Sequence, residues 1–238
     1  MNDMEPQKKS FNIKILLELT IVFLTILSIK YLADYFGVIG AGSIAIWCGI
    51  IVSTIFMKQK KTKWKEYGLK IPKGTKKWLI NILIAISTVI LVFSIMGLIV
   101  KPILESFGLT NPADVADRFA FFMGKPLVFI VYLITVVWFG AALGEELLFR
   151  GYLLNRLVDC TGNNKFGIII ALIIHAVIFG MLHIYQGLAG VIATGCIALI
   201  FGSVYFIIKR KLFPIIIAHG IINSLSLIGL YLNDGIIS

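Results

Sequence analysis

Charged residues are scarce in this sequence. Only 14% of its 238 residues are Asp, Glu, Lys or Arg, whereas about 25% is usual in a soluble domain. Apolar residues make up 59% and the mean hydropathy is +0.96, against about 45–50% apolar residues in soluble proteins. A chain of this composition cannot cover itself with a water-soluble surface. A soluble enzyme and a nucleic-acid-binding protein are therefore excluded.

Cysteines and acidic residues are also few. Cys48, Cys160 and Cys196 lie far apart without CxxC spacing, so neither a disulfide framework nor a thiolate metal site is indicated. The patterns of serine hydrolases, HExxH metalloproteases, GxGxxG dinucleotide folds and Walker loops are missing too. The sequence has 12 acidic and 22 basic residues, which gives a net charge of +10. In so apolar a chain, this excess is typical of the cytoplasmic loops of a membrane protein.

Seven apolar segments are long enough to cross the roughly 30 Å hydrocarbon layer of a bilayer as helices. They lie at about 13–34, 38–57, 79–100, 127–149, 166–184, 188–208 and 212–232. The polar start, Met1–Asn12, leads into the first segment without a small-residue cleavage site, so this segment is predicted to be an uncleaved span. The sequence thus predicts an all-α, polytopic membrane helix bundle of about seven helices, within a range of six to eight.

Lysine and arginine are distributed unevenly over the connections between these segments. With the N-terminus inside, eighteen of the 22 basic residues fall in inner segments and four in outer segments. Cytoplasmic loops of membrane proteins carry such an excess. We therefore expect an integral protein of a prokaryotic cell membrane, with the N-terminus in the cytoplasm and the C-terminus outside.

The sequence divides into an N-terminal part, residues 1–126, and a helical core, residues 127–238. In the first part, residues 58–77 hold nine lysines and a single acid. This basic cytoplasmic loop is expected to fix the orientation and to attract anionic lipids, with about 1 kcal/mol per basic residue near the surface. Farther along, an Asn-Pro-Ala-Asp helix start predicts an interfacial helix over 112–123.

A cluster of charges lies inside the fourth predicted span, where each ionisable group costs about 2.5–3.5 kcal/mol to insert. Glu146 and Arg150 are four residues apart and can pair on one helical face, whereas the neighbouring Glu145 points about 100° away. Adjacent acids in unequal environments suit general acid–base chemistry. A salt bridge at the inner end of the helix explains the cluster equally well.

Histidines mark two further clusters. Phe179 and His183 stand four residues apart near the end of the fifth span, which also contains His175. In the seventh span, His219 and Asn223 lie one turn apart on a common face. Packed histidines and polar contacts between helices are the alternative explanations for these residues.

Together, the three clusters supply the groups for one reaction. The glutamates offer a base, the guanidinium offers an electrostatic partner, and the imidazoles and carboxamide offer hydrogen-bond donors for an oxyanion. Such groups, brought together, suit the hydrolysis of an amide bond by an activated water.

The motifs EExxxR at Glu145–Arg150, FxxxH at Phe179–His183 and HxxxN at His219–Asn223 resemble, in this order, the CPBP (Abi) family. That family comprises the CAAX proteases and bacteriocin-processing enzymes, including the type II CAAX prenyl endopeptidases. The resemblance covers about residues 127–232, and the short Tyr67-Gly68-Leu69 is also similar to the family. It implies an all-helical intramembrane endopeptidase.

The resemblance also implies how the site is divided among its residues. Glu145 would activate the attacking water, and His183 would assist as a second acid–base or water-orienting group. Glu146 and Arg150 would organise the site through their ion pair.

His219 and Asn223 would then stabilise the oxyanion of the tetrahedral intermediate. No cofactor or metal is expected, because the resemblance favours a glutamate and a water, and because Asn223 is a poor metal ligand. The alternative is a zinc site formed by Glu145, His183 and His219, a two-histidine, one-carboxylate set with an open position.

The predicted helix boundaries conflict with such a site. Along straight helices, His183 lies roughly 27 Å from Lys165, and His219 only about 10 Å from Leu212. Residues at such different depths would not meet. Either the fourth helix extends inward past Arg150 and the fifth is tilted or re-entrant, or the boundaries are wrong.

The expected function is cleavage of a membrane-associated or lipidated, CAAX-like peptide or protein. The expected partners are this substrate and membrane lipids, and no nucleic acid. One alternative is a non-catalytic bacteriocin-immunity or peptide-binding membrane protein. The other is a proton-coupled transporter, since intramembrane Glu and His also build proton relays. It is disfavoured because transporters usually show internal repeats, and none is evident here.

Overall fold

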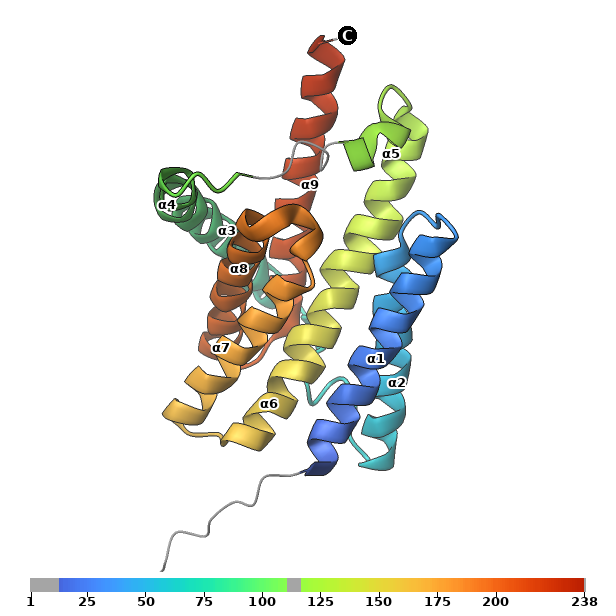
Figure 1. Ribbon diagram of the computed structural model, residues 1–238. Coiled ribbons are helices and arrows are strands. Elements are labelled where there is room, and N and C mark those ends of the chain that lie inside the picture. Colours follow the sequence, from blue (N-terminus) through green and yellow to red (C-terminus); the bar gives the residue numbers. More distant parts are fainter. Residues whose placement is uncertain (1–12, 111–116, 238) are drawn as a thin grey trace, which may run out of the picture.

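A computed structural model describes residues 13–110 and 117–237, and within these ranges the chain forms helices and no β-strand (Figure 1). In chain order the helices are α1 (Ile13–Tyr35), α2 (Ala41–Gln59), α3 (Thr75–Ile95), η1 (Met96–Val100), α4 (Lys101–Ser106), η3 (Asp117–Phe122), α5 (Pro126–Tyr132), η4 (Leu133–Leu153), α6 (Leu154–Thr161), α7 (Lys165–Met181), η5 (Ile184–Gln186), α8 (Gly187–Ile207) and α9 (Leu212–Ile237). The predicted all-α fold is confirmed.

Six helical stretches are long and apolar enough to cross a membrane. They are Ile13–Tyr35, Ala41–Gln59, Thr75–Ser106, Pro126–Thr161, Ile184–Ile207 and Leu212–Leu232. A shorter apolar helix of 17 residues, α7, accompanies them. The protein is thus an integral membrane protein, and its helices fall within the predicted range of six to eight.

The end predicted for the fourth span is wrong. The sequence suggests that this helix stops just before Arg150, but it continues to Thr161. Arg150 and Arg156 were expected in an inner loop, whereas both are buried in the bundle, where they pair with Glu146 and Glu18 respectively. A charge that finds a partner inside the bundle can remain in a membrane helix. The helix therefore extends more than two turns farther than its charges indicate.

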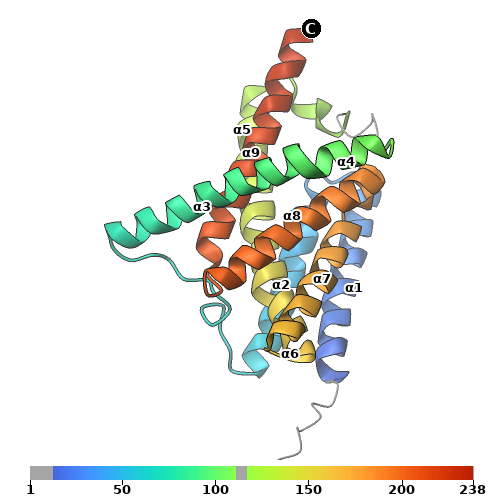
Figure 2. The same cartoon turned by 90° about the vertical axis from the view of Figure 1, so that its left-hand side faces the viewer.

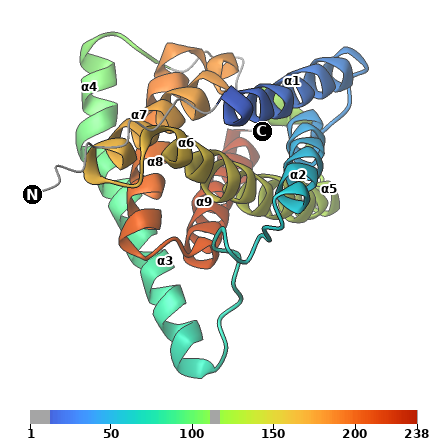
Figure 3. The same cartoon turned by 90° about the horizontal axis from the view of Figure 1, so that it is seen from below.

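The long helix formed by α5, η4 and α6 runs through the middle of the bundle (Figure 1). Seen from below, α1 and α2 lie on one side of it, and α7 and α8 lie on another (Figure 3). It packs against α2, α7 and α9. The helix α3 lies outermost, crosses the bundle obliquely and contacts α8 and α9 (Figure 2). The most enclosed helix is therefore the one that carries the EExxxR motif.

The basic connection between α2 and α3 packs against the turn between α8 and α9. The Tyr205 hydroxyl donates a hydrogen bond to the carbonyl of Tyr67, and the amide of Leu212 donates to the carbonyl of Gly68. Gly68 has a φ of +98°, and a side chain there would collide with the carbonyl of Arg210. The Tyr67-Gly68-Leu69 segment is therefore a fitted part of the bundle.

The predicted interfacial helix over 112–123 is seen only in part, since residues 111–116 lie outside the described residues. From Asp117 to Phe122 the chain forms a 3₁₀ helix, η3. Phe122 is fully buried, with its ring 5.4 Å from the rings of both Phe129 and Tyr132. The Phe122 ring therefore packs against α5 inside the protein.

Candidate active site

Glu146 lies at the buried centre of the candidate site. Its carboxylate has no exposed surface, and its Oε1 accepts hydrogen bonds from Arg150 Nη1 at 2.9 Å and from His219 Nδ1 at 2.7 Å. Arg150 stands one turn along η4, as the spacing predicts, whereas His219 comes from α9. Glu146 therefore joins the first and third motifs directly.

The guanidinium of Arg150 lies between two aromatic rings. Its Cζ is 4.7 Å from the ring centroid of Phe179 and 5.3 Å from that of Phe201. Removing a charge from water costs several kcal/mol, and cation–π contacts in a desolvated site return about 2 kcal/mol. Arg150 thereby connects η4 to α7 and α8. The Phe201 ring also lies 5.7 Å from that of His219.

His183 joins this group through Phe179. It follows the end of α7, whereas the sequence placed it inside a helix over 166–184. Its ring lies 4.8 Å from the Phe179 ring, and its Nδ1 is 2.9 Å from the Phe179 carbonyl oxygen. Because a carbonyl can only accept, Nδ1 carries the proton and donates. The Nε2 of the neutral ring is then free to accept a proton or to orient a water.

Glu145 is placed differently from its neighbour. It is half-buried, and among residues 13–110 and 117–237 no group hydrogen bonds to its carboxylate. It interacts electrostatically with Arg150 and with Tyr185, the residue two positions after His183. The two adjacent acids therefore have separate surroundings, as the sequence predicts: one is fully enclosed and paired, and the other has an uncommitted carboxylate.

Asn223 lies one turn beyond His219 on α9 and is half-buried. In the described part of the chain, nothing hydrogen bonds to its carboxamide, which is thus available as a donor. The Trp138 ring of η4 packs on the intervening Gly220, where it would lie 2.5 Å from a Cβ.

Helix lengths resolve the predicted conflict of depth. Phe179 stands 14 residues after the start of α7, and Glu146 stands 15 residues before the end of α6, so both lie roughly 20 Å from the α6–α7 turn. The start of α9 is not at the edge of the bundle, since Leu212 packs against Gly151 of η4. His219 therefore reaches the level of Glu146 within two turns.

His175, the less favoured histidine, has no exposed surface and lies between the rings of Phe149 and Phe179, at 6.3 and 6.4 Å. Neither of its ring nitrogens has a hydrogen-bond partner in the described ranges. His175 stands one helical turn before Phe179, and its ring packs against the Phe179 ring. Its contacts are those of a packing residue.

The zinc alternative required Glu145, His183 and His219 to converge. Among the residues that the structure describes, no three His, Cys, Asp or Glu side chains are grouped closely enough to hold a metal ion. The one direct contact between a histidine and a carboxylate in this region is that of His219 with Glu146, and Arg150 occupies the same carboxylate oxygen.

Four residues at or next to the site were not predicted. Phe201 and Trp138 pack on Arg150 and Gly220, and no motif marks either of them. Tyr185 lies 5.8 Å from the His183 ring, and Arg118 stacks on it at 4.7 Å. Closeness to His183 in the sequence was the only available signal for Tyr185.

Comparison with known proteins gives one match. Residues 127–225 match a protein family described as type II CAAX prenyl endopeptidase Rce1-like. This segment holds all three motifs and extends from α5 into α9. No curated protein and no solved structure matches the chain. The family match supports a membrane endopeptidase.

Proposed function

We propose that this chain, whose residues 127–225 match the Rce1-like CAAX prenyl endopeptidases, is an intramembrane endopeptidase that uses a glutamate-activated water. Its substrate would be a membrane-associated or lipidated, CAAX-like peptide or protein. One observation carries the proposal. Glu146 is fully buried and held by Arg150 and His219, while the carboxylate of the adjacent Glu145 is uncommitted.

In the proposed reaction, Glu145 removes a proton from a water molecule as the water oxygen adds to the carbonyl carbon of the scissile peptide bond. The carbonyl oxygen becomes an oxyanion, to which the Asn223 carboxamide donates a hydrogen bond. His219 donates from Nε2 when both of its nitrogens are protonated, with the Glu146 carboxylate as counter-ion. The tetrahedral intermediate then collapses: the carbonyl double bond re-forms, the C–N bond breaks, and the departing nitrogen takes up the proton that Glu145 removed from the water.

His183 would assist at the leaving group. Since its Nδ1 donates to the Phe179 carbonyl, its Nε2 can accept the proton that Glu145 removed from the water and pass it on to the departing amine. The Phe179 ring packs on both His183 and Arg150, so it fixes the distance between the two halves of the site. We propose that no metal takes part, and chelation by EDTA should then leave cleavage unchanged.

The direct test replaces Glu145 in the full-length protein, reconstituted in bilayers. We expect Glu145→Ala and Glu145→Gln to reduce cleavage at least 1,000-fold, because neither can take the proton from water. The measurement compares new peptide termini in the membrane proteome of cells carrying each form, together with cleavage of a prenylated CAAX peptide by the purified proteins.

Glu105→Ala is the matched control, because Glu105 is an exposed acid of α4 with only a distant lysine partner. It should retain full activity and the same melting temperature. A folded Glu145→Ala protein that still cleaves would refute the mechanism. One that no longer cleaves but still confers the cellular phenotype would show that peptide binding, as in an immunity protein, is the biological role.

A further inference from the structure

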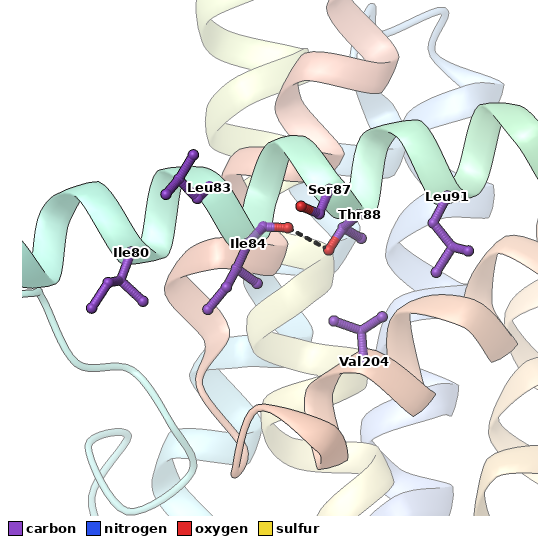
Figure 4. A pocket seen from close by; sticks show the side chains of 7 residues that line it. All are labelled: Ile80, Leu83, Ile84, Ser87, Thr88, Leu91 and Val204. Carbon is purple, nitrogen blue, oxygen red and sulfur yellow. Dashed lines mark hydrogen bonds between the residues drawn. The ribbon is translucent and has the colours of Figure 1, made fainter.

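A groove runs along the outermost helix of the bundle, far from the candidate active site in sequence. It has a volume of about 340 Å³ and is lined by Ile80, Leu83, Ile84, Ser87, Thr88, Leu91 and Val204 (Figure 4). All but the last belong to α3, and Val204 comes from α8. The Thr88 hydroxyl donates a hydrogen bond to the carbonyl oxygen of Ile84. Five of the seven lining residues are apolar, and the other two are Ser87 and Thr88.

The groove follows α3 from Ile80 to Leu91, over which this helix rises about 16 Å along its own axis. Because α3 crosses the bundle obliquely, the groove also runs at an angle to the other helices (Figure 2). At its lower end, the Trp78 ring meets the Phe213 ring edge to face at 4.9 Å. A half-exposed tryptophan in this position is typical of the interface between hydrocarbon and headgroups.

Exposed lysines surround this same end. Lys76 and Lys77 stand in the first turn of α3, and Lys209 and Lys211 stand in the turn between α8 and α9. The contact between Trp78 and Phe213 brings these two segments together. In the described ranges none of the four lysines pairs with a carboxylate. The sequence between Asp159 and Asp234 has no acid at all.

The two features complement one another. An apolar groove accepts an acyl chain, and exposed lysines on the segments that meet at its Ile80 end can bind a phosphate. Basic pockets between membrane helices bind anionic headgroups for this reason. We propose that α3, α8 and the α8–α9 turn form a binding site for an anionic glycerophospholipid, with its phosphate at the four lysines and one acyl chain along the groove.

This site would hold α3 against the bundle. Apart from η1, which continues it, helix α3 makes its main contacts with α9 and α8, and most of its residues are exposed. A lipid bound in the groove would contact α3 and α8 at once. The proposal is independent of the peptidase function, because none of its residues belongs to the candidate active site.

The test uses the full chain in nanodiscs made of equal amounts of phosphatidylglycerol and phosphatidylcholine. Lipid retained by the protein is counted by native mass spectrometry. We expect the unaltered protein to retain phosphatidylglycerol about tenfold over phosphatidylcholine. The variant K76Q/K77Q/K209Q/K211Q should lose this preference, since it removes the four ammonium groups that attract the phosphate.

The matched control is K61Q/K63Q/K65Q/K70Q, which removes the same charge from exposed positions in the connection between α2 and α3. It should keep the preference. Equal loss in both variants would show diffuse attraction and overturn the site. If the first variant fails to assemble, K76Q/K77Q against K61Q/K63Q makes the same comparison.

The groove is tested separately. Val204→Trp fills it and should reduce the retained phosphatidylglycerol about tenfold with all lysines in place. Leu199→Trp places the same ring at an exposed position of α8 and should retain the lipid. Retention that is unchanged in Val204→Trp would overturn the role of the groove, and an unaltered protein without preference would overturn the whole proposal.

Discussion

At the scale of single residues, two neighbours in the sequence have opposite surroundings. Glu146 is enclosed by Arg150 and His219, whereas Glu145 keeps a free carboxylate at the edge of the same helix. In η4 the hydrogen bonding is of the wider π type, which occurs often at functional sites. Adjacent residues of a helix point in different directions, so Glu146 can organise the site while Glu145 can contact a substrate.

Arg150 gives the sharpest prediction at this scale. Arg150→Ala leaves the Glu146 carboxylate buried without its ion-pair partner, so the free energy of unfolding should fall by about 3–5 kcal/mol. Arg150→Lys retains the charge but not the flat surface that stacks between Phe179 and Phe201. The melting temperature of Arg150→Lys should lie between those of the unaltered protein and Arg150→Ala. Its rate of cleavage should fall at least tenfold. Thermal melting and peptide cleavage measure both effects, and full activity in Arg150→Lys would contradict the stacking role.

At the scale of elements, the site depends on how closely α7 approaches α8. A Cβ at Gly180 would lie 2.5 Å from the carbonyl oxygen of Val191 and 3.4 Å from the Cα of Gly195. Small residues let membrane helices meet at this distance. Because Phe179 precedes Gly180, the same contact sets the position of the ring that joins Arg150 to His183.

Gly180→Val should therefore push α7 away from α8. We expect a loss of about 1–3 kcal/mol in the free energy of unfolding and a loss of cleavage in the protein that remains folded. Gly97→Val is the control, since a Cβ at Gly97 has no heavy atom within 4 Å. Equal melting temperatures and equal rates of cleavage in the two variants would show that the close contact between α7 and α8 at Gly180 is unimportant.

At the scale of the whole molecule, Glu18 connects the N-terminal helices to the helical core of residues 127–238. It accepts hydrogen bonds from Arg156 at 2.9 Å, from Lys60, and from the Tyr152 hydroxyl. An acid inside the first predicted span was a visible signal for such a contact, although its partners could not be read from the sequence. The divide at residue 126 is thus bridged by a buried ion pair.

Glu18→Ala should loosen this connection. Arg156 keeps Asp159 as a partner but loses its buried one, so we expect the free energy of unfolding to fall by about 3 kcal/mol. Asp34→Ala breaks the exposed pair with Lys30 and should change it by less than about 1 kcal/mol. Chemical unfolding in detergent measures both, and equal effects would show that Glu18 adds no special stability.

The orientation in the membrane can be tested as well. The start of α1 and the end of α9 lie at opposite ends of the bundle (Figure 1), and the basic connections predict that the α1 end faces the cytoplasm. In a background without the three native cysteines, Lys125→Cys should react with an impermeant maleimide in intact cells. Lys61→Cys should react only after permeabilisation, and the reverse pattern would invert the assignment.

The sequence by itself determined the class of the protein. Long apolar segments require a helical membrane bundle, since backbone groups in lipid must be hydrogen bonded within a helix. The motif spacings also predicted the Glu146–Arg150 pair, because residues four apart share a face of one helix. These are local properties, and local periodicity is visible in a sequence.

Only the tertiary structure decided which residues of different helices lie at the same depth in the membrane. The sequence ended the fourth helix at Arg150 and began the seventh at the membrane edge, because buried and exposed charges look the same in a sequence. In the folded chain Arg150 pairs with Glu146 of its own helix and stacks on Phe179 of α7 and Phe201 of α8. Arg156 pairs with Glu18 of α1, and Leu212 packs against Gly151. Contacts between segments that are distant in the sequence thus bring His219 to Glu146 and place Phe201 on Arg150. Such contacts can be formed only in the folded protein, where paired charges can remain inside the membrane.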